Sequence, residues 1–546
     1  RNGKRSAGAA VKIAVDMVNE GLIDRKTAVG RVTPDQVEML LHRQVDPKAE
    51  NEVLAKGLPA SPGAGVGIVC FDADDAVELA KSGKKVILAR PETCPDDIHG
   101  LFAAEAIVTS RGGMTSHAAV VARGLGKPCV SGCEDIVIDL NKETITKGDK
   151  VVRKGDTITV DGSAGRVLLG GAPLKEASFS EDFKTVLSWS DEFSRLQVWA
   201  NGDTPEDARR ARSFGARGIG LCRTEHMFMA ADRLPVMQRL VVADSYEERI
   251  KALDELKVMQ KADFYGILKE MQGLPVIIRL LDPPLHEFMP KEKDLEEELA
   301  ELVAAGKEHS PEADGVRKVM AKVEALKESN PMLGFRGCRL GIVYPEISAM
   351  QASAIFEAVL QLVEEGIDIH PEIMIPLVGV KTEMEFFRKQ IDEIAKGYME
   401  KSGRKFNYLV GTMIEVPHAA FVADQIAEYA EFFSFGTNDL TQTTFGYSRD
   451  DAEGKFLGHY EDKGILPVNP FHELDRDGVG ALMQIAVEKG RKVNSKLSIG
   501  ICGEHGGNPS SIAFCHAVGL NYVSCSPFRV PVARISAAHA AMGKLS

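Results

Sequence analysis

Short apolar runs of strand type recur eight times from residue 196 onward, and each interval between them contains helical patterning. The runs are LQVWA (196–200), GIGLC (218–222), PVIIRL (275–280), IMIPLV (373–378), YLVGTMI (408–414), FFSF (432–435), LSIGI (497–501) and YVSCS (522–526). Eight β-then-α units predict a (β/α)8 TIM barrel over residues 196–546. The alternative is an open doubly wound sheet, which usually has fewer strands. The longest insertion follows the third run, and its charged stretch EKDLEEELAELVAAGKEH predicts a solvated helix.

The part of the chain before the barrel has a different texture. Residues 1–53 read as a helical segment with two amphipathic helices, AGAAVKIAVDMVNEG and TPDQVEMLLHRQ, the second with a threonine cap and a proline in its first turn. Residues 54–175 mix glycine-rich turns with short strands such as KKVILAR and AIVTS, which predicts a compact α/β domain. The polar residues 176–195 are expected to be a linker or a bridging helix.

Composition excludes some classes of protein. A chain of 546 residues is too long for one core, and a net charge of −13 gives no basic face for a nucleic acid. No apolar run has membrane-spanning length and no signal peptide opens the sequence, so we expect no membrane partner. The nine cysteines are scattered, which favours a reducing compartment. A cytoplasmic location is the expectation, and targeting to an organelle is the alternative.

The stretch RGGMTSHAAVVARGLG, residues 111–126, places a histidine at the start of a helix. Thr115 or Ser116 is a good N-cap, and Gly124 suits the end of the helix. His117 then lies in the first turn, where the helix dipole disfavours imidazolium and keeps the ring nucleophilic. The alternative for a lone histidine is a structural or capping role.

A phosphoryl group is the substituent that His117 is best placed to carry at this helix start. The free N–H groups and the dipole of the first turn stabilise an anion, and a phosphoramidate bond is labile enough to release it. Gly112 and Gly113 leave room for a tetrahedral group to approach. The stretch therefore predicts a histidine that accepts and releases phosphate.

Polar or reactive side chains follow several of the predicted barrel strands, where a TIM barrel places its chemistry. A single such residue could equally be a surface residue or a salt bridge, but several strand ends with converging chemistry predict a site. They are Arg223, Arg279, Glu415, the Gly436-Thr437-Asn438-Asp439 segment and Cys502.

Charge suggests a role for each residue of this site. Glu415 and Asp439 are hard oxygen donors on neighbouring units, and with substrate oxygens and water they suit Mg²⁺. Guanidinium and amide groups can hold a phosphoryl group and a carboxylate and spread positive charge around a phosphoryl group in transit. The candidates for substrate binding are Arg223, Arg279, Arg336, Asn438 and Arg449, with Gly436 and Thr437 beside them.

Cys502 suits a different step. A thiol over a methylene carbon can donate a proton to it, and the thiolate can remove one in reverse. The alternative is an inert buried cysteine.

These motifs together resemble the phosphoenolpyruvate (PEP) utilising enzymes. GGMTSHAAVVARG resembles their phosphohistidine domain, and most closely its pyruvate, phosphate dikinase branch, because other branches usually carry arginine at Met114. GLCRTEHMF, GFRGCRLG, GTMIEVP, SFGTNDLTQ and GICGEHGG are similar to dikinase motifs of the barrel. The resemblance implies a swivelling phosphohistidine domain with His117 as its carrier, PEP and pyruvate as substrates, Mg²⁺ as cofactor and Cys502 as proton donor. It also implies a homodimer.

The resemblance further implies an ATP-binding domain. This sequence contains no glycine-rich phosphate loop followed by lysine, so we expect that domain to lie before residue 1. A full-length dikinase converts ATP, phosphate and pyruvate into AMP, diphosphate and PEP. We expect this chain to run the half-reaction between phosphohistidine and pyruvate. Thr115 matches the threonine at which plant dikinases are switched off by phosphorylation, although capping is the simpler role.

One departure and three alternatives accompany this interpretation. The family often has arginine after GTMIEVP, where this chain has His418, so a fixed positive charge is lost there. A phosphoenolpyruvate synthase, or an enzyme I that passes phosphate to a carrier protein, would use the same chemistry. A regulatory scaffold that merely binds PEP would be expected to have lost some site residues.

Overall fold

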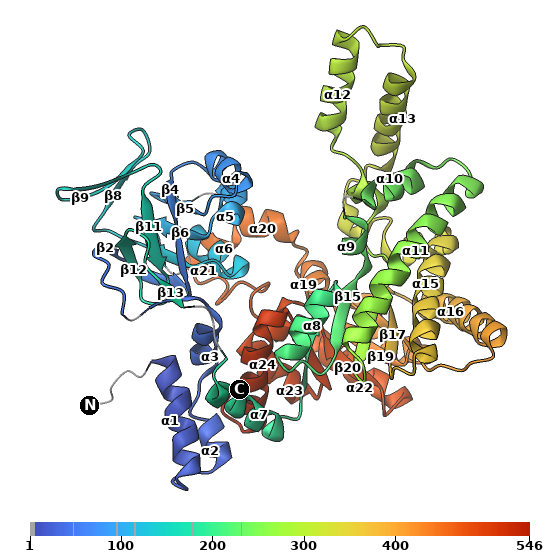
Figure 1. Cartoon of the computed structure of the whole chain (residues 1–546). Helices are drawn as coiled ribbons and strands as arrows, with labels where there is room; N and C mark the ends of the chain where they lie inside the picture. The colour runs from blue at the N-terminus through green and yellow to red at the C-terminus, as the bar shows by residue number, and fades with distance from the viewer. Residues whose placement is uncertain are drawn as a thin grey trace. The chain divides into compact units, whose positions relative to one another are not determined.

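Eight parallel strands close into a barrel, which confirms the predicted fold class. In a computed structural model, residues 6–46, 48–93, 97–113, 116–175, 179–230 and 232–545 are described. Contacts divide the chain into two units, Arg1–Phe193 with Ser448–Asn469, and Ser194–Tyr447 with Pro470–Ser546. The barrel forms the second unit (Figure 1). Its strands are β14 (Gln197–Asn201), β15 (Ile219–Arg223), β16 (Pro275–Arg279), β17 (His370–Ile375), β18 (Leu409–Ile414), β19 (Phe432–Phe435), β20 (Ser498–Ile501) and β21 (Tyr522–Cys525).

Each predicted apolar run lies on one barrel strand, and β21 pairs with β14 to close the cylinder. Large side chains fill the interior, where the ring of Tyr522 stacks on Trp199 with centroids 4.0 Å apart. A second apolar layer lies between the strands and the surrounding helices. Burial on both faces explains why the strands are apolar throughout rather than alternating.

Helices follow the strands in the order expected of the fold. They are α8 (Pro205–Ser213), α9 (Thr224–Phe228), α10 (Leu234–Val242), α11 (Tyr246–Glu270), η2 (Leu285–Phe288), α12 (Glu292–Ala304), α13 (Pro311–Leu326), η3 (Pro331–Leu333), α14 (Gly337–Val343), α15 (Pro345–Glu364), α16 (Lys381–Ser402), α17 (Pro417–Phe421), α18 (Ala423–Ile426), α19 (Thr437–Phe445), α22 (Val479–Val493), η4 (Glu504–Gly507), α23 (Pro509–Val518), η5 (Pro527–Arg529) and α24 (Val530–Ala541). None of the described helices of either unit is long and apolar enough to cross a bilayer.

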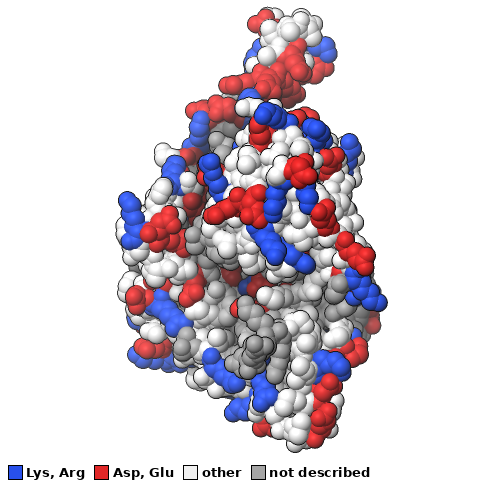
Figure 2. Space-filling model, turned by 90° about the vertical axis from the view of Figure 1, so that its left-hand side faces the viewer, with Lys and Arg blue, Asp and Glu red and all other residues white. Residues whose placement is uncertain are grey.

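The insertion after β16 contains a helical hairpin, α12 and α13, that projects from the rest of the barrel unit (Figure 1). Leu295 is the buried residue of α12, so the predicted solvated helix is confirmed. Acidic side chains crowd the projecting element at the top of Figure 2, and basic and acidic side chains are mixed over the rest of that face. The hairpin therefore adds charge rather than core.

The first unit is built on a mixed eight-stranded sheet. Its strands, in spatial order, are β2 (Val53–Lys56), β12 (Arg166–Leu169), β11 (Thr157–Asp161), β4 (Ala64–Cys70), β5 (Val86–Arg90), β6 (Ala106–Thr109), β7 (Cys129–Ser131) and β3 (Leu58–Ser61). The four central strands β4 to β7 are parallel, and the outer pairs are antiparallel.

Helices and two small sheets complete this α/β fold. Apolar residues of α4 (Ala73–Lys81), α5 (Ile98–Ala103) and α6 (His117–Leu125) join one core cluster on the sheet. A second cluster includes residues of the three-stranded sheet of β8 (Val137–Asp139), β9 (Thr144–Lys147) and β10 (Lys150–Arg153). The strands β1 (Gln44–Val45) and β13 (Leu174–Lys175) pair with each other.

Three helices rather than two form the N-terminal segment, so the prediction of two is wrong. They are α1 (Ala7–Asn19), α2 (Arg25–Val29) and α3 (Pro34–Leu41), and Thr33 caps the last with a reciprocal bond to Gln36. The five residues of α2 are too few to show a helical period. Most of the predicted linker is the helix α7 (Glu181–Phe193), which packs on α1 and α2.

The segment Ser448–Asn469 groups with the first unit, although the predicted barrel range of 196–546 includes it. It forms two short helices, α20 (Arg449–Lys455) and α21 (Leu457–Asp462). The Asn469 side chain donates to Glu453 at 3.0 Å, and its backbone N–H donates to Glu461 at 2.8 Å. These two bonds join the end of the segment Ser448–Asn469 to its own helices, so the segment folds back on itself instead of extending α19.

Candidate active site

The predicted barrel residues lie where the strands end. Arg223 and Arg279 are the last residues of β15 and β16, Glu415 follows β18, and Cys502 follows β20. Asn438 and Asp439 lie in the first turn of α19, directly after β19. Because the strands are parallel, all of these residues lie at the same end of the barrel. Arg336 comes from the insertion after β16, immediately before α14, and joins them.

A buried carboxylate that was not among the predicted site residues, Asp282, joins two of the arginines. Its Oδ2 lies 3.0 Å from Nη1 of Arg279 and accepts from Nη2 of Arg336 at 2.7 Å. Burial raises the pKa of Asp282, but the two guanidinium groups outweigh burial and hold the pKa below its usual value. Asp282 therefore stays ionised and fixes both arginines relative to each other.

Arg279 has a second carboxylate partner on α9. Its Nη2 donates to Oε1 of Glu225, and both side chains are buried. Burial alone would lower the pKa of Arg279, but Asp282, Glu225 and Glu415 raise it above its usual value. The guanidinium is therefore permanently charged although water is excluded.

Arg336 also lies close to one of the two predicted metal ligands. Its Nη1 lies 3.4 Å from Oδ1 of Asp439, a predicted metal ligand. Gly337 follows with φ +56°, and a Cβ there would lie 2.8 Å from Cβ of Leu377. The glycine of GFRGCRLG is thus required for the chain to turn beside Arg336.

Glu415 is fully buried and receives a hydrogen bond from a strained residue. The N–H of Leu377 donates to Oε1 of Glu415 at 2.6 Å, and Leu377 has φ +63°, which is rare for leucine. Burial and the nearby carboxylates of Asp439 and Asp282 raise the pKa of Glu415 well above its usual value. Sequence gave no signal for this strain, because Leu377 lay in a run read as strand.

Glu415 and Asp439 fit a divalent cation. Oε2 of Glu415 is buried and has no hydrogen-bond partner among the described residues, and the same holds for Oδ1 of Asn438. A Cβ on Gly436 would lie 2.7 Å from Oε2 of Glu415, so only glycine leaves space beside this oxygen. In the described part of the chain no three His, Cys, Asp or Glu side chains form a metal cluster. A cation here would need substrate or water oxygens as well, which is how proteins usually hold Mg²⁺.

Cys502 lies between the barrel interior and the site. It belongs to the interior apolar cluster with Tyr522 and Met413, and its Sγ lies 3.6 Å from the carbonyl oxygen of Phe435. Burial raises the pKa of Cys502 to about 11, against the opposing effects of Ser434 and Arg279. At neutral pH the group is therefore a thiol that carries a proton to give.

A buried histidine that sequence analysis passed over connects the Cys502 loop to α19. Nε2 of His505 lies 2.9 Å from the carbonyl oxygen of Pro470, which can only accept, so Nε2 carries the proton. Nδ1 then accepts from the hydroxyl of Thr437 at 2.8 Å. Thr437, a predicted substrate-binding residue, thus donates its hydroxyl to His505 in this structure.

Arg223 is held by a carboxylate of its own. Asp203 accepts from the backbone N–H of Arg223 at 2.7 Å, and its Oδ2 lies 2.9 Å from Nη2 of the same residue. Nδ1 of His226 lies 2.7 Å from that oxygen. Asp203 was missed because nothing in its sequence neighbourhood marks it as a partner of Arg223.

Two other predicted positions have less direct settings. Arg449 lies in α20 of the first unit, 3.3 Å from Glu453, so its role in substrate binding stays a prediction. His418 is exposed, and its Nδ1 lies 2.8 Å from the carbonyl oxygen of Gly379. His418 therefore contacts the loop after β17.

The histidine loop lies in the first unit. His117 is the first residue of α6, as predicted, while Thr115 and the side chain of His117 lie outside the described residues. Gly113 has no atom within 4 Å of an added Cβ and is open as expected, whereas a Cβ on Gly112, which has φ +102°, would lie 2.8 Å from Cβ of Ser116, so the open space expected at Gly112 is not there. The helix continues to Leu125 and stops at Gly126, which has φ +65°, so Gly124 is not its end.

Models of known protein families match residues in both units. The family model "PEP-utilising enzyme, PEP-binding domain" matches residues 178–542, and "PEP-utilising enzyme, mobile domain" matches residues 83–165. The chain belongs to the PEP-utilising enzyme family. It is 54% identical to a pyruvate, phosphate dikinase of Rhizobium meliloti (strain 1021) over 99% of this chain and 59% of the relative.

Plant proteins give a similar result. Pyruvate, phosphate dikinase 1, chloroplastic, of Arabidopsis thaliana is 54% identical over 98% of this chain and 55% of the relative. Pyruvate, phosphate dikinase 2 of Oryza sativa subsp. japonica is 53% identical over 98% of this chain and 60% of the relative. The chain thus spans somewhat more than half the length of the curated relatives it matches.

Proposed function

We propose that this chain transfers a phosphoryl group between PEP and His117, releasing or consuming pyruvate. The observation that carries the proposal is the buried cluster of Arg279, Arg336 and Asp282 beside Glu415 and Cys502 at the carboxyl end of the barrel. Positive charge fixed in a site shielded from water can stabilise a phosphoryl group in transit far better than it could in solution.

The residues divide the work by charge. Arg279 and Arg336 would hold the phosphoryl and carboxylate groups of PEP, and the side-chain NH₂ group of Asn438 would donate to a phosphoryl oxygen. Glu415 and Asp439 would hold Mg²⁺, which when bound neutralises charge on the phosphoryl oxygens. With the metal bound, the carboxyl of Glu415 is expected to ionise despite its raised pKa.

The reaction then balances in two steps. A lone pair on the imidazole of His117 forms an N–P bond as the P–O bond of PEP breaks, which leaves the enolate of pyruvate. Cys502 gives its proton to the methylene carbon of the enolate and later regains one from solvent. In reverse the thiolate removes a methyl proton. Because His117 and the barrel residues belong to different units, we propose that the first unit delivers His117 as a swivelling domain.

The longer relatives carry the name pyruvate, phosphate dikinase, and we propose that the whole protein runs that reaction with ATP and phosphate. Their identity to this chain favours a dikinase over a phosphoenolpyruvate synthase or an enzyme I. All the described cysteines are free, which supports a reducing compartment such as the cytoplasm. A homodimer remains part of the proposal on family resemblance.

Phosphoenzyme formation tests the proposal. The chain is incubated with [³²P]PEP and Mg²⁺, and the expected product is acid-labile label on His117. His117→Asn should lose the label, while His309→Asn, a control on an exposed turn, should keep it. Equal labelling of His117→Asn would overturn the assignment.

A further inference from the structure

We propose that Gln351, a buried residue of α15 outside the predicted site, positions the arginine pair that binds the phosphoryl group. The inference rests on the proposed function of Arg279 and Arg336, and extends it to a residue that does not touch them. The structure supports it through the short segment Leu280-Leu281-Asp282, which links the end of β16 to the carboxylate that both arginines share.

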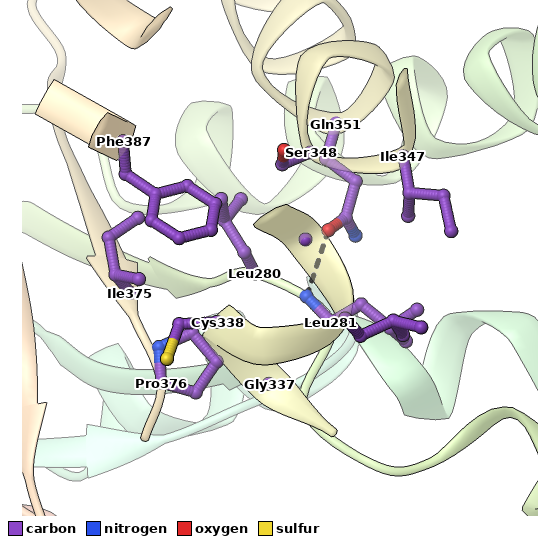
Figure 3. Close-up of a pocket in the computed structure, with 12 residues that line it drawn as sticks. Leu280, Leu281, Gly337, Cys338, Ile347, Ser348, Gln351, Ile375, Pro376 and Phe387 are labelled. Carbon is purple, nitrogen blue, oxygen red and sulfur yellow. Dashed lines mark hydrogen bonds between the residues drawn. The ribbon is translucent and has the colours of Figure 1, made fainter. Parts of the chain in front are cut away.

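The amide of Gln351 is bonded directly to this segment. Its Oε1 accepts from the backbone N–H of Leu281 at 2.8 Å, and both residues are buried. Figure 3 shows the Gln351 side chain reaching from its helix to that nitrogen, with the bond drawn as a dashed line. Leu281 stands between Arg279 and Asp282 in the chain, so this bond acts on the backbone between two residues of the site.

The ladder of backbone hydrogen bonds between β16 and the neighbouring β17 ends at Leu280, so the N–H of Leu281 needs another acceptor. The N–H of Leu280 still donates to the carbonyl of Met374 at 3.0 Å, but β16 ends at Arg279 and the next N–H is satisfied by Gln351. The carbonyl of Asp282 accepts from the N–H of Gly337 at 2.8 Å. A buried N–H of Leu281 without a partner would destabilise this position of the segment.

Packing alone does not fix the segment. A cavity of about 10 Å³ lies among Leu280, Leu281, Gly337, Cys338 and Gln351, enough for about one water molecule. Close-packed side chains would restrain the backbone on their own, whereas an incompletely filled space allows it to shift. The hydrogen bond from Leu281 therefore adds a restraint at the point of the segment where packing is incomplete.

A second glutamine orients the amide. Nε2 of Gln351 donates to Oε1 of Gln260 on α11 at 3.4 Å, which directs Oε1 of Gln351 to Leu281. Both glutamines are fully buried between helices whose other contacts are largely apolar. Burying two amides is costly unless they are bonded to a group that needs them, and Leu281 is that group.

A variant that removes the acceptor but keeps the shape tests the proposal. Gln351→Met has a similar length and no amide oxygen, so Asp282 and both arginines should shift. A displacement of this kind can lower the rate of a chemical step by up to about 100-fold. We expect [³²P]PEP to label Gln351→Met about tenfold more slowly than wild type. Gln351→Glu, which keeps an acceptor oxygen, should restore most of that rate.

Ser348→Ala is the matched control, because Ser348 lines the same cavity from the same helix. Its hydroxyl bonds with Pro345 and Gln390 and not with the arginine segment, so the labelling rate should stay at the wild-type value. If Gln351→Met does not fold, the shorter Gln351→Asn, whose amide cannot reach Leu281, takes its place.

A double variant separates positioning from general structural damage. If Gln351 acts through Asp282, Gln351→Met should slow labelling no further when it is added to Asp282→Asn. Effects that multiply, or a Gln351→Met rate equal to wild type, would overturn the inference. A wild-type chain that takes no label from PEP would instead refute the proposed function, so the two failures are distinguishable.

Discussion

Replacing Asp282 with asparagine removes the negative charge that Arg279 and Arg336 share while keeping the side chain nearly the same size. The Oδ2 atom lies 3.0 Å from one guanidinium nitrogen and 2.7 Å from the other. Asp282 is 4% exposed, so water cannot replace the lost charge. The variant leaves Arg279 with Glu225, and Arg336 with Asp439 at 3.4 Å.

The size of the effect follows from burial and from the two bonds. Removing one partner of a buried ion pair costs about 3–5 kcal/mol. Asparagine can still accept one hydrogen bond, so we expect a loss of about 2–4 kcal/mol in barrel stability at neutral pH. Since the pKa of Asp282 is lowered in the fold, this stability is present above the ordinary carboxyl pKa and is lost as the pH falls through the lower folded value.

Activity should fall through displacement of the guanidinium groups. A shift of about 1 Å in a catalytic group can cost about 100-fold, so we expect labelling of His117 by [³²P]PEP to slow by about that factor. Barrel stability can be followed separately by urea unfolding. The chain has two tryptophans, Trp189 in the first unit and Trp199 in the barrel, so a Trp189→Phe background leaves Trp199 as the reporter.

Asp314→Asn is the control, because its pair with Arg317 is on the surface and its side chain is 72% exposed. It should change stability by less than about 0.5 kcal/mol and leave labelling unchanged. The reasoning is refuted if Asp282→Asn labels at the wild-type rate, or if it unfolds at the same urea concentration as the control.

Three further predictions address other parts of the site. Cys502→Ala should abolish the exchange of pyruvate methyl protons with solvent, which can be followed by NMR after the chain has been phosphorylated by PEP. Because the thiol pKa is about 11, the wild-type exchange rate should rise about tenfold per pH unit near neutrality. An exchange rate that does not depend on pH would contradict the thiolate as base. Glu415→Gln should raise the Tm of the metal-free protein at about pH 8, because the raised carboxyl pKa of Glu415 means that stability falls as the pH rises above the unfolded value near 4.3. The same variant should no longer be stabilised by Mg²⁺. Equal Tm values with and without Mg²⁺ in the wild type would argue against the metal site. Gly337→Ala should lower the free energy of unfolding in urea by about 2–4 kcal/mol, because its Cβ would lie 2.8 Å from Cβ of Leu377. The control Gly366→Ala, at φ +75° with nothing within 4 Å, should lower it by about 1 kcal/mol. Equal losses of stability in the two variants would show that the contact with Leu377 is unimportant.

Sequence predicted the barrel well because its strands are buried on both faces and bounded by polar residues. The position after each strand then indicated Arg223, Arg279, Glu415 and Cys502, since in this fold the strand ends meet at one edge. These predictions need only local pattern and one rule of the fold. The short α2 helix was missed because five residues carry no period.

The partners of those residues were beyond the reach of sequence. Asp282 pairs with Arg336 across 54 positions, and that pairing depends on how the insertion returns to the barrel. Leu377 adopts a left-handed backbone that its side chain disfavours, which tertiary contacts impose. Gln351 and His505 read as ordinary polar residues until the structure shows which buried groups they satisfy.

Isotope exchange between pyruvate and PEP tests the central claim most directly. The chain is incubated with [¹⁴C]pyruvate, unlabelled PEP and Mg²⁺, with no ATP, AMP or inorganic phosphate. If His117 takes phosphate from PEP and returns it to pyruvate at the barrel, label should appear in PEP, and His117→Asn should abolish the exchange. Absence of exchange in the wild type, or exchange that persists in His117→Asn, would contradict the account.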